Sequence, residues 1–267
     1  MNDAITHTSL NELPIWLSMS SITLEEMKAV KLMNRIDTKY VVSDEDVMTL
    51  LERVSALGYR VQIIGDKRAA RYDTLYYDTA ERDMYIRHHN RILTRQKIRT
   101  RHYVDNDATF LEVKNKSNRG RTDKRRTSIE HSSFANIHSN AQAVEFLAER
   151  SHYALDTLSP ALATRFTRIT IVNPTLTERV TIDLNLEYED VRSGCRAKIR
   201  GMAIIEIKQD GNIRSKAKEI LNRLRVKPMR VSKYCLGTAL TVDDIKRNRM
   251  IEKIRRIKKR VGYNEIR

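Results

Sequence analysis

Residues that cross-link small secreted folds or hold metal clusters are scarce in this sequence. It has two cysteines, Cys195 and Cys235, in 267 residues, and they form neither a CxxC motif nor a disulfide framework. This usage fits a reducing compartment, and a single bridge between the two stays open as an alternative. The seven histidines show no metal-ligand spacing, so the His88-His89 pair is interpreted as loop surface.

Long apolar runs are missing as well. No stretch approaches 18 consecutive apolar residues, so no membrane-spanning helix is expected. The first residues show no basic region followed by an apolar run, so no signal peptide is expected either. Together these absences predict a soluble, cytoplasmic protein.

No internal repeat, low-complexity linker or change of composition divides the chain. Its 267 residues are enough for one large barrel-type domain. We predict a loosely docked N-terminal arm or short helix in residues 1–20, a main α+β domain in residues 21–241 and a basic helix in residues 242–267. That helix has only a thin apolar stripe, so its basic face is either solvated or a contact for a polyanion or an anionic lipid surface.

Acidic residues are outnumbered by basic ones. Lysine and arginine number 50 against 34 aspartates and glutamates, which gives a formal net charge of +16. This balance predicts a polyanionic partner: nucleic acid, a phosphate-rich small molecule, a phosphate polymer or an anionic membrane. The charged strand faces described below lack the interleaved aromatic residues that stack bases, so nucleic acid is the least favoured of these.

Residues 91–126 are the most informative stretch, because they predict two strands that each collect charged residues on one face. A turn at Asp105-Asn106-Asp107 separates the strands. Since side chains alternate along a strand, residues of the same parity share a face. On the first strand this face holds Arg95, Lys97, Arg99, Arg101 and Tyr103, and on the second it holds Phe110, Glu112, Lys114 and Lys116. One such strand, taken alone, would be typical of the solvated face of an antiparallel sheet.

The same alternation recurs in the segments 164–172, 178–187 and 201–209. Their inward faces are predicted to carry Phe166, Arg168 and Thr170; Arg179, Thr181, Asp183, Asn185 and Glu187; and Met202, Ile204, Glu206 and Lys208. This recurrence predicts an α+β fold in which an antiparallel β-barrel encloses a charged, water-filled lumen and turns its apolar side to helices packed outside. Unpaired buried charges are costly, so only a ligand of opposite charge would make such a lumen favourable.

These faces combine the two kinds of group that phosphoryl transfer needs. Arginine and lysine hold a phosphate chain in line, and carboxylates carry a divalent metal that bridges phosphate oxygens. Mg²⁺ or Mn²⁺ would suit the carboxylates, because both are hard, oxygen-seeking ions. The predicted carboxylates are Glu112, Asp183, Glu187 and Glu206, and the predicted cations are Lys97, Arg99, Arg101, Lys114, Lys116, Arg168, Arg179 and Lys208. Plain ion pairing, of Glu112 with a cross-strand neighbour and of Glu206 with Lys208, is the alternative.

Nine short motifs occur in an order that resembles a known family. They are RIDTKY (35–40), LYYDT (75–79), RTRHY (99–103), FLEVKNKS (110–117), DKRR (123–126), RFTR (165–168), RVTIDLNL (179–186), AIIEIK (203–208) and RVSKY (230–234). In this order they resemble the VTC domain, the catalytic domain of the vacuolar transporter chaperone polyphosphate polymerases, which has the triphosphate tunnel metalloenzyme fold. The related triphosphatases and cyclases begin with an ExExK strand. RIDTKY stands in its place here, which favours the polymerase branch.

The resemblance implies roles for individual residues of this sequence. Arg99 and Arg101 would grip the nucleotide phosphates, and Glu206 would bear the metal. The other basic tunnel positions would be Lys39, Lys114, Lys124, Arg168 and Arg179. Ser232 and Lys233 match a Ser-Lys pair near the tunnel end, beside the basic Arg230, although a helix N-cap is the alternative role for Ser232. Phe166 stands where a tyrosine is expected, so a hydroxyl contact is lost.

The activity that the resemblance implies is metal-dependent phosphoryl transfer. The terminal phosphoryl group of ATP would pass to phosphate or to a growing polyphosphate chain inside the basic tunnel, with Mn²⁺ or Mg²⁺ bound. Two alternatives stay open. One is a tunnel-type triphosphatase that hydrolyses a nucleoside or inorganic triphosphate. The other is a polyphosphate-binding module without catalysis, for which steeply salt-dependent binding is expected.

Overall fold

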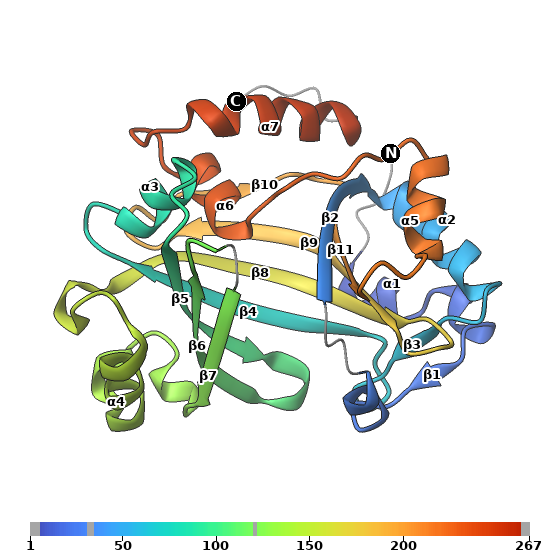
Figure 1. Ribbon diagram of the computed structural model, residues 1–267, viewed down its shortest axis with the longest axis horizontal. Helices are drawn as coiled ribbons and strands as arrows, with labels where there is room; N and C mark the ends of the chain where they lie inside the picture. The colour runs from blue at the N-terminus through green and yellow to red at the C-terminus, as the bar shows by residue number, and fades with distance from the viewer. Residues whose placement is uncertain (1–5, 31–34, 120–121, 263–267) are drawn as a thin grey trace.

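A curled, largely antiparallel sheet organises the chain (Figure 1). The computed structural model describes residues 6–30, 35–119 and 122–262. Hydrogen bonds join the long strands in the order β2-β11-β9-β8-β4-β5-β6-β7. Their bounds are β2 (Arg35–Ser43), β4 (Ala69–Asp78), β5 (Arg95–Tyr103), β6 (Ala108–Lys116), β7 (Thr122–Ser128), β8 (Ser159–Val172), β9 (Glu178–Asp190) and β11 (Met202–Asp210). Three short strands extend the sheet: β10 (Arg196–Lys198) on β9, β3 (Arg60–Gln62) on β8, and β1 (Ser21–Ile22), which runs parallel to β3.

The sheet forms a half-barrel rather than a closed barrel. Within the described ranges its edge strands, β2 and β7, are not hydrogen-bonded to one another. β7 carries Asp123, Lys124, Arg125 and Arg126 in succession, and a charged edge strand resists further pairing. The predicted α+β fold, with an antiparallel curled sheet and helices outside, is therefore confirmed, and closure of the barrel is the point of difference.

Helices α2 (Asp44–Ser55) and α5 (Lys216–Arg223) cover the outer, apolar face of β2, β9 and β11. Helix α2 begins after Ser43, whose hydroxyl accepts a hydrogen bond from the backbone N–H of Asp46 at 3.2 Å. The apolar residues of α2 recur at helical spacing and share one core with the outward residues of β9 and β11, namely Val47, Leu50, Leu51, Val54, Val180, Ile182, Ile205 and Ile207. At the other end of the strand order, α4 (Ala141–Arg150) contacts β6 and β7 and packs on the same outer face, against Leu111 and Val113. This packing fixes which face of the sheet is turned inward.

The N-terminal segment contains a short helix, one of the two predicted alternatives, and packs more tightly than a loosely docked arm would. Helix α1 (His7–Asn11) and a 3-10 turn (Pro14–Leu17) place Leu10 and Trp16 in the same core as α2. The Trp16 indole N–H donates to the carbonyl of Leu10 at 2.8 Å, so the polar end of this buried ring is satisfied. Residues 1–5 of the predicted arm lie outside the described residues.

Helices α3 (Asp83–His89) and α6 (Lys233–Thr241) lie together, and α7 (Asn248–Arg260) runs from them across the top of the view to β2 and α2 (Figure 1). Helix α6 lies against the inner face of β8 and β9, where a side chain at Gly237 would collide with Leu162 and Tyr188. Helix α7 contacts α6 and β2 and buries Met250 and Ile257 in the same core. The predicted basic helix of residues 242–267 thus begins at Asn248, and its residues 263–267 lie outside the described residues.

A β-bulge in β9 changes which residues face inward. Asn185 has a φ of 52°, and the pairing of β9 with β8 shifts by one residue there. Asp183 lies before the bulge and faces inward, whereas Tyr188 faces inward beyond it and packs against α6. Glu187 therefore points outward, where it pairs with Lys198 at 2.9 Å. The prediction that Glu187 belongs to the charged lumen is wrong for this reason.

The structure bears on two expectations from the sequence, those for membrane-spanning helices and for a disulfide bridge. None of the described helices combines the length and the apolar character that crossing a bilayer requires. Cys195 is exposed and Cys235 is buried, and both are free thiols. The bridge that the sequence leaves open is therefore not formed.

Candidate active site

The inner face of the half-barrel brings the predicted cations and carboxylates together. The antiparallel register sets Arg99 opposite Glu112 and Arg168 opposite Asp183, so these residues face each other across neighbouring strands. The full set is Lys39 on β2; Lys97, Arg99 and Arg101 on β5; Glu112, Lys114 and Lys116 on β6; Lys124 on β7; Arg168 on β8; Arg179 and Asp183 on β9; Glu206 and Lys208 on β11; and Arg230, Ser232 and Lys233 at the start of α6.

Asp183 is the counter-charge of two of these cations. Its carboxylate accepts hydrogen bonds from Arg168 Nε at 2.5 Å and from Arg168 Nη2 at 2.9 Å, and it also pairs with Lys233 of α6. Burial raises the pKa of Asp183, but the charges of Arg168 and Lys233 outweigh burial and hold this pKa below its usual range. Phe166 lies beside both cations, with its ring centroid 4.4 Å from Lys233 Nζ. The Asp183 carboxylate is thus ionised and fully engaged.

Glu112, on β6, is likewise the counter-charge of two cations. One carboxylate oxygen accepts a hydrogen bond from Arg99 Nε at 2.7 Å, and the other pairs with Lys124. Burial raises the pKa of Glu112, but the charges of Arg99, Arg101 and Lys124 hold it below its usual range. Burial of Lys124 outweighs the attraction of Glu112 and lowers the lysine pKa to about 8. Arg99 also donates from Nη1 to the Tyr76 hydroxyl at 3.2 Å.

Glu206 is the most accessible of the three inner carboxylates. Its side chain is 20% exposed, against 1% for Glu112 and 3% for Asp183. Lys208 lies 2.7 Å from Oε2 of Glu206, whereas Lys39 lies 3.5 Å from Oε1. Burial raises the pKa of Glu206, but the charges of Lys39 and Lys208 hold it well below its usual range. Glu206 therefore presents an ionised oxygen that its neighbours hold only loosely.

A divalent metal fits Glu206 better than it fits the other two carboxylates. Mg²⁺ is commonly held by one or two carboxylates together with substrate phosphates, rather than by an all-protein cage. Both oxygens of Glu112 and of Asp183 are engaged by cations, so the geometry gives no support to their predicted role as metal ligands. Across the described part of the chain, no three His, Cys, Asp or Glu side chains converge on a preformed metal site.

Several inner cations have no carboxylate partner among the described residues. Arg101 is 6% exposed, and its Nε donates to the Thr74 hydroxyl at 3.1 Å. The Nε of Arg179 is buried without a hydrogen-bond partner. Lys97 donates to the hydroxyl of Ser232 at 2.9 Å. Burying a cation without a counter-charge is costly, so this face is suited to an anion that supplies the missing charge.

The start of α6 faces the same site. Ser232 caps the helix by accepting a hydrogen bond from the backbone N–H of Cys235 at 3.4 Å, so the N-cap interpretation of Ser232 is confirmed. Since Ser232 also accepts from Lys97, capping and a place in the site are not exclusive. The positive end of the helix dipole adds to the attraction for an anion. Next in the chain, Tyr234 donates from its hydroxyl to the buried carboxylate of Asp78, which fixes α6 against β4.

The sequence interpretation left two parts of this site unassigned: Tyr76, interpreted only as a core or rim residue, and helix α6. Tyr76 has the same parity on β4 as Tyr72 and Thr74, both of which contact inner cations, so alternation along β4 was the signal for it. For α6 the motif RVSKY was recognised, but the nine-residue helix that follows is mostly buried and shows no amphipathic pattern.

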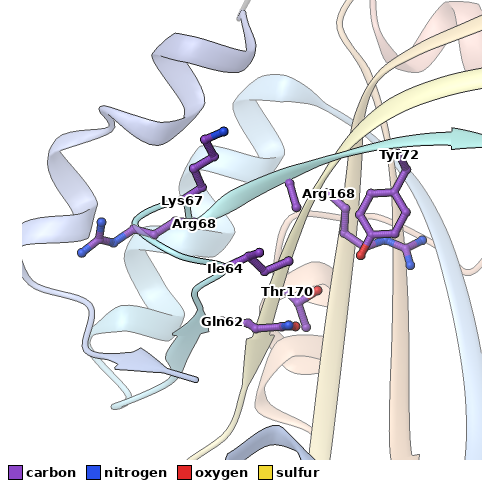
Figure 2. A pocket seen from close by; sticks show the side chains of 8 residues that line it. Gln62, Ile64, Lys67, Arg68, Tyr72, Arg168 and Thr170 are labelled. Atoms are coloured by element: carbon purple, nitrogen blue, oxygen red, sulfur yellow. The ribbon is translucent and has the colours of Figure 1, made fainter. Parts of the chain in front are cut away.

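A small cavity lies beside Tyr72 and Arg168, toward the end of β8 (Figure 2). Its volume is about 10 Å³, which is room for one water molecule. Figure 2 shows the side chains of Lys67 and Arg68 directed away from Arg168, and Lys67 is engaged by Asp105 at 2.8 Å. The cavity therefore does not extend the cationic site.

Lys97 provides a pH test of the site. Burial, with the charges of Lys39, Lys114 and Arg99, lowers the Lys97 pKa to about 7. An unfolded lysine titrates near about 10.4, so between these values the unfolded state binds more protons and the folded state gains stability as pH rises. We expect Lys97→Met to have its full stability advantage over the wild type at about pH 6 and to lose it, by roughly 1 kcal/mol per pH unit, as the pH rises from about 7 to about 10.4. Urea denaturation at several pH values measures this, and parallel curves for the two proteins would contradict it.

Comparisons with known proteins agree with this geometry. A sequence profile of the VTC domain matches residues 34–242. Comparison with curated protein sequences gave no match. Among solved structures, a Hippeastrum protein described as a candidate adenylyl cyclase with a dominant triphosphatase activity has a TM-score of 0.50 and 15% identity, covering 77% of this chain and 95% of that one. Its likeness shows a shared fold.

Two further structures are similar at lower scores. A candidate adenylate cyclase from Vibrio parahaemolyticus has a TM-score of 0.44 and 12% identity, covering 76% of this chain and 96% of that one. A protein from Pyrococcus horikoshii has a TM-score of 0.44 and 14% identity, covering 76% of this chain and 97% of that one. Because the profile match takes in every strand of the inner face and the start of α6, the chain belongs to the VTC domain family.

Proposed function

We propose that this chain is a nucleotide-dependent polyphosphate polymerase, which transfers the terminal phosphoryl group of ATP to phosphate or to a growing polyphosphate chain. The observation that carries the proposal is the imbalance of charge on the inner face. Glu112, Asp183 and Glu206 each serve two cations, while Arg101 and Arg179 have no carboxylate partner within the described residues. A triphosphate or a polyphosphate chain supplies closely spaced negative charges that match this surplus.

In phosphoryl transfer the protein contributes mainly by positioning the substrates and by stabilising charge on the phosphoryl group. The acceptor phosphate is already anionic, so no general base is required. Arg99 and Arg101 would hold the triphosphate with their forked guanidinium groups, and Lys233 would neutralise charge that develops during transfer. Because Glu112 engages Arg99 before substrate arrives, this guanidinium is already oriented.

Glu206 would hold Mn²⁺ or Mg²⁺ together with phosphate oxygens of the substrate. The metal would supply charge neutralisation on those oxygens. Lys39 and Lys208 keep the carboxylate ionised and oriented from either side.

The test is product analysis after incubating the purified chain with ATP and Mn²⁺. We expect chains that lengthen with time, and a loss of about a hundredfold or more in rate for Glu206→Gln. Arg53→Gln, on the outer helix α2, is the matched control and should behave as the wild type. Absence of chains from the wild type, or equal rates for wild type and Glu206→Gln, contradicts the proposal.

A hydrolase is the second candidate, and one observation favours it. Apolar residues of α6 and α7 share a core with inner-face residues at one end of the half-barrel, among them Leu162, Tyr188 and Ile204. A site closed at one end suits a small triphosphate as well as it suits a chain. Release of free phosphate without longer products would establish the triphosphatase, and tight, salt-sensitive binding without turnover would establish a binding module.

The proposed location of this activity is the cytoplasm. Both cysteines are free thiols, and Cys195 is exposed, which is typical of proteins from a reducing compartment. The proposed donor, ATP, is a cytoplasmic nucleotide.

A further inference from the structure

The inner face of the β5–β6 hairpin places like charges directly opposite one another. Lys97 lies opposite Lys114, and Arg95 lies opposite Lys116. On the next strand Lys124 lies opposite Lys114, so a row of lysines crosses β5, β6 and β7. Like charges in directly opposed positions destabilise an antiparallel pair. Two such pairs in succession therefore weaken the free protein unless an anion lies along them.

The positive charges continue beyond the strands, at the rim next to α7. Lys253 of α7 donates from its ammonium group to the backbone carbonyl of Arg230 at 2.9 Å. The pKa of Lys116 is lowered by burial and by the charges of Arg95 and Arg230. The pKa of Lys253 is lowered by burial and by Arg91 and Arg230. These residues therefore lie close enough to repel one another.

No carboxylate relieves this repulsion in the part of the chain that the structure describes. None of the residues Arg91, Arg95, Lys116, Arg230 and Lys253 belongs to an ion pair there. Nor can the cations easily move apart. The β ladder fixes the backbones of Arg95 and Lys116 opposite one another, and α7 is held by its buried Ile257 and by the pair between Arg260 and Asp46 at 2.6 Å. The rim cations lie next to Lys97, the first lysine of the row across β5, β6 and β7. The ammonium group of Lys97 contacts Ser232 in the active site.

We propose that Arg91, Arg95 and Lys253, with Lys116 and Arg230, form a rim track that binds the part of a polyphosphate chain extending out of the active site. The inference rests on the proposed function and adds a path for the polymer. Because α6 and α7 fill this end of the inner face with apolar side chains, a chain that leaves on this side follows the rim. The profile match ends at residue 242, so Lys253 lies outside the residues that it covers.

The test compares ligands of different length on a variant that leaves the active-site residues in place. Arg91→Asn with Lys253→Gln removes two track charges, and asparagine tolerates the positive φ of 62° at position 91. Arg53→Gln with Arg223→Gln removes two exposed charges from the outer helices α2 and α5 and is the matched control. The probes are tripolyphosphate, long-chain polyphosphate and duplex DNA, and the measurement is the dissociation constant at fixed ionic strength.

We expect the track variant to bind long-chain polyphosphate about tenfold more weakly and tripolyphosphate within about twofold of the wild type, with the control unchanged. The inference is overturned by unchanged binding of long chains, by an equal loss for tripolyphosphate, or by an equal loss for DNA, which would indicate a general polyanion surface. Chain synthesis by the wild type is measured alongside. If the wild type makes chains but the track variant binds long chains normally, the rim track is contradicted and the proposed function stands. If the wild type makes no chains, the proposed function is contradicted, regardless of how the track variant binds.

Discussion

Replacing Arg101 with methionine should reduce polyphosphate synthesis about a hundredfold or more and should make the folded protein about 1 kcal/mol more stable. Arg101 is buried, and burial together with the charges of Arg99 and Arg168 lowers its pKa, so the free protein holds this cation at a cost. Methionine fills similar space and keeps contacts with the rings of Tyr72 and Phe166, which lie 5.6 Å and 5.8 Å from the guanidinium carbon. Initial rates with ATP and Mn²⁺, and urea unfolding without ligand, measure the two effects.

Arg82→Met is the matched control, because it should lower the stability of the folded protein, whereas Arg101→Met should raise it. Arg82 is also buried, at 7% exposure, but it pairs with Asp190 and lies outside the inner face. Arg82→Met leaves the Asp190 carboxylate without its cation and should destabilise the protein by about 3 kcal/mol. If Arg101→Met proves as destabilising as Arg82→Met, then Arg101 is a structural residue, and the surplus of charge is not a binding device.

The sequence predicts the cationic face well because alternation along a strand is a local property. Parity alone places Arg99 and Glu112 on one side of the hairpin, and antiparallel pairing then sets them opposite one another. The N-cap at Ser43 is equally local, since it depends on residues three apart. Such features need no knowledge of how distant segments meet.

What the sequence could not supply depends on distant contacts. Parity fails at Asn185, where the bulge turns Glu187 outward. Asparagine tolerates a positive φ, but an asparagine within a strand does not by itself establish a bulge. The partner of each carboxylate depends on tertiary packing, as Lys233 reaches Asp183 only because α6 docks on β9. Likewise, closure of the barrel depends on whether the edges β2 and β7 meet, which alternation within either strand does not decide.

Asp183→Asn should destabilise the free protein by about 3 kcal/mol and should make it bind tripolyphosphate more tightly than the wild type. The amide keeps the shape of the carboxylate but leaves Arg168 and Lys233, whose side chains are 16% and 13% exposed, without their counter-charge. A bound phosphate chain then supplies the charge that Asp183 no longer provides, so the ligand should restore more stability to the variant than to the wild type. Urea unfolding with and without tripolyphosphate measures both quantities.

The same variant decides between two roles for Asp183. If Asp183 is a counter-charge, as its engaged oxygens indicate, the Mn²⁺ concentration that gives half-maximal synthesis should match that of the wild type, although the rate falls because Arg168 and Lys233 lose their fixed positions. If Asp183 is a metal ligand, the variant should need far more Mn²⁺, and its affinity for tripolyphosphate without metal should not rise. Glu206→Gln, measured in the same titration, should show the raised Mn²⁺ requirement, because Glu206 is the carboxylate whose oxygen is left open to a metal.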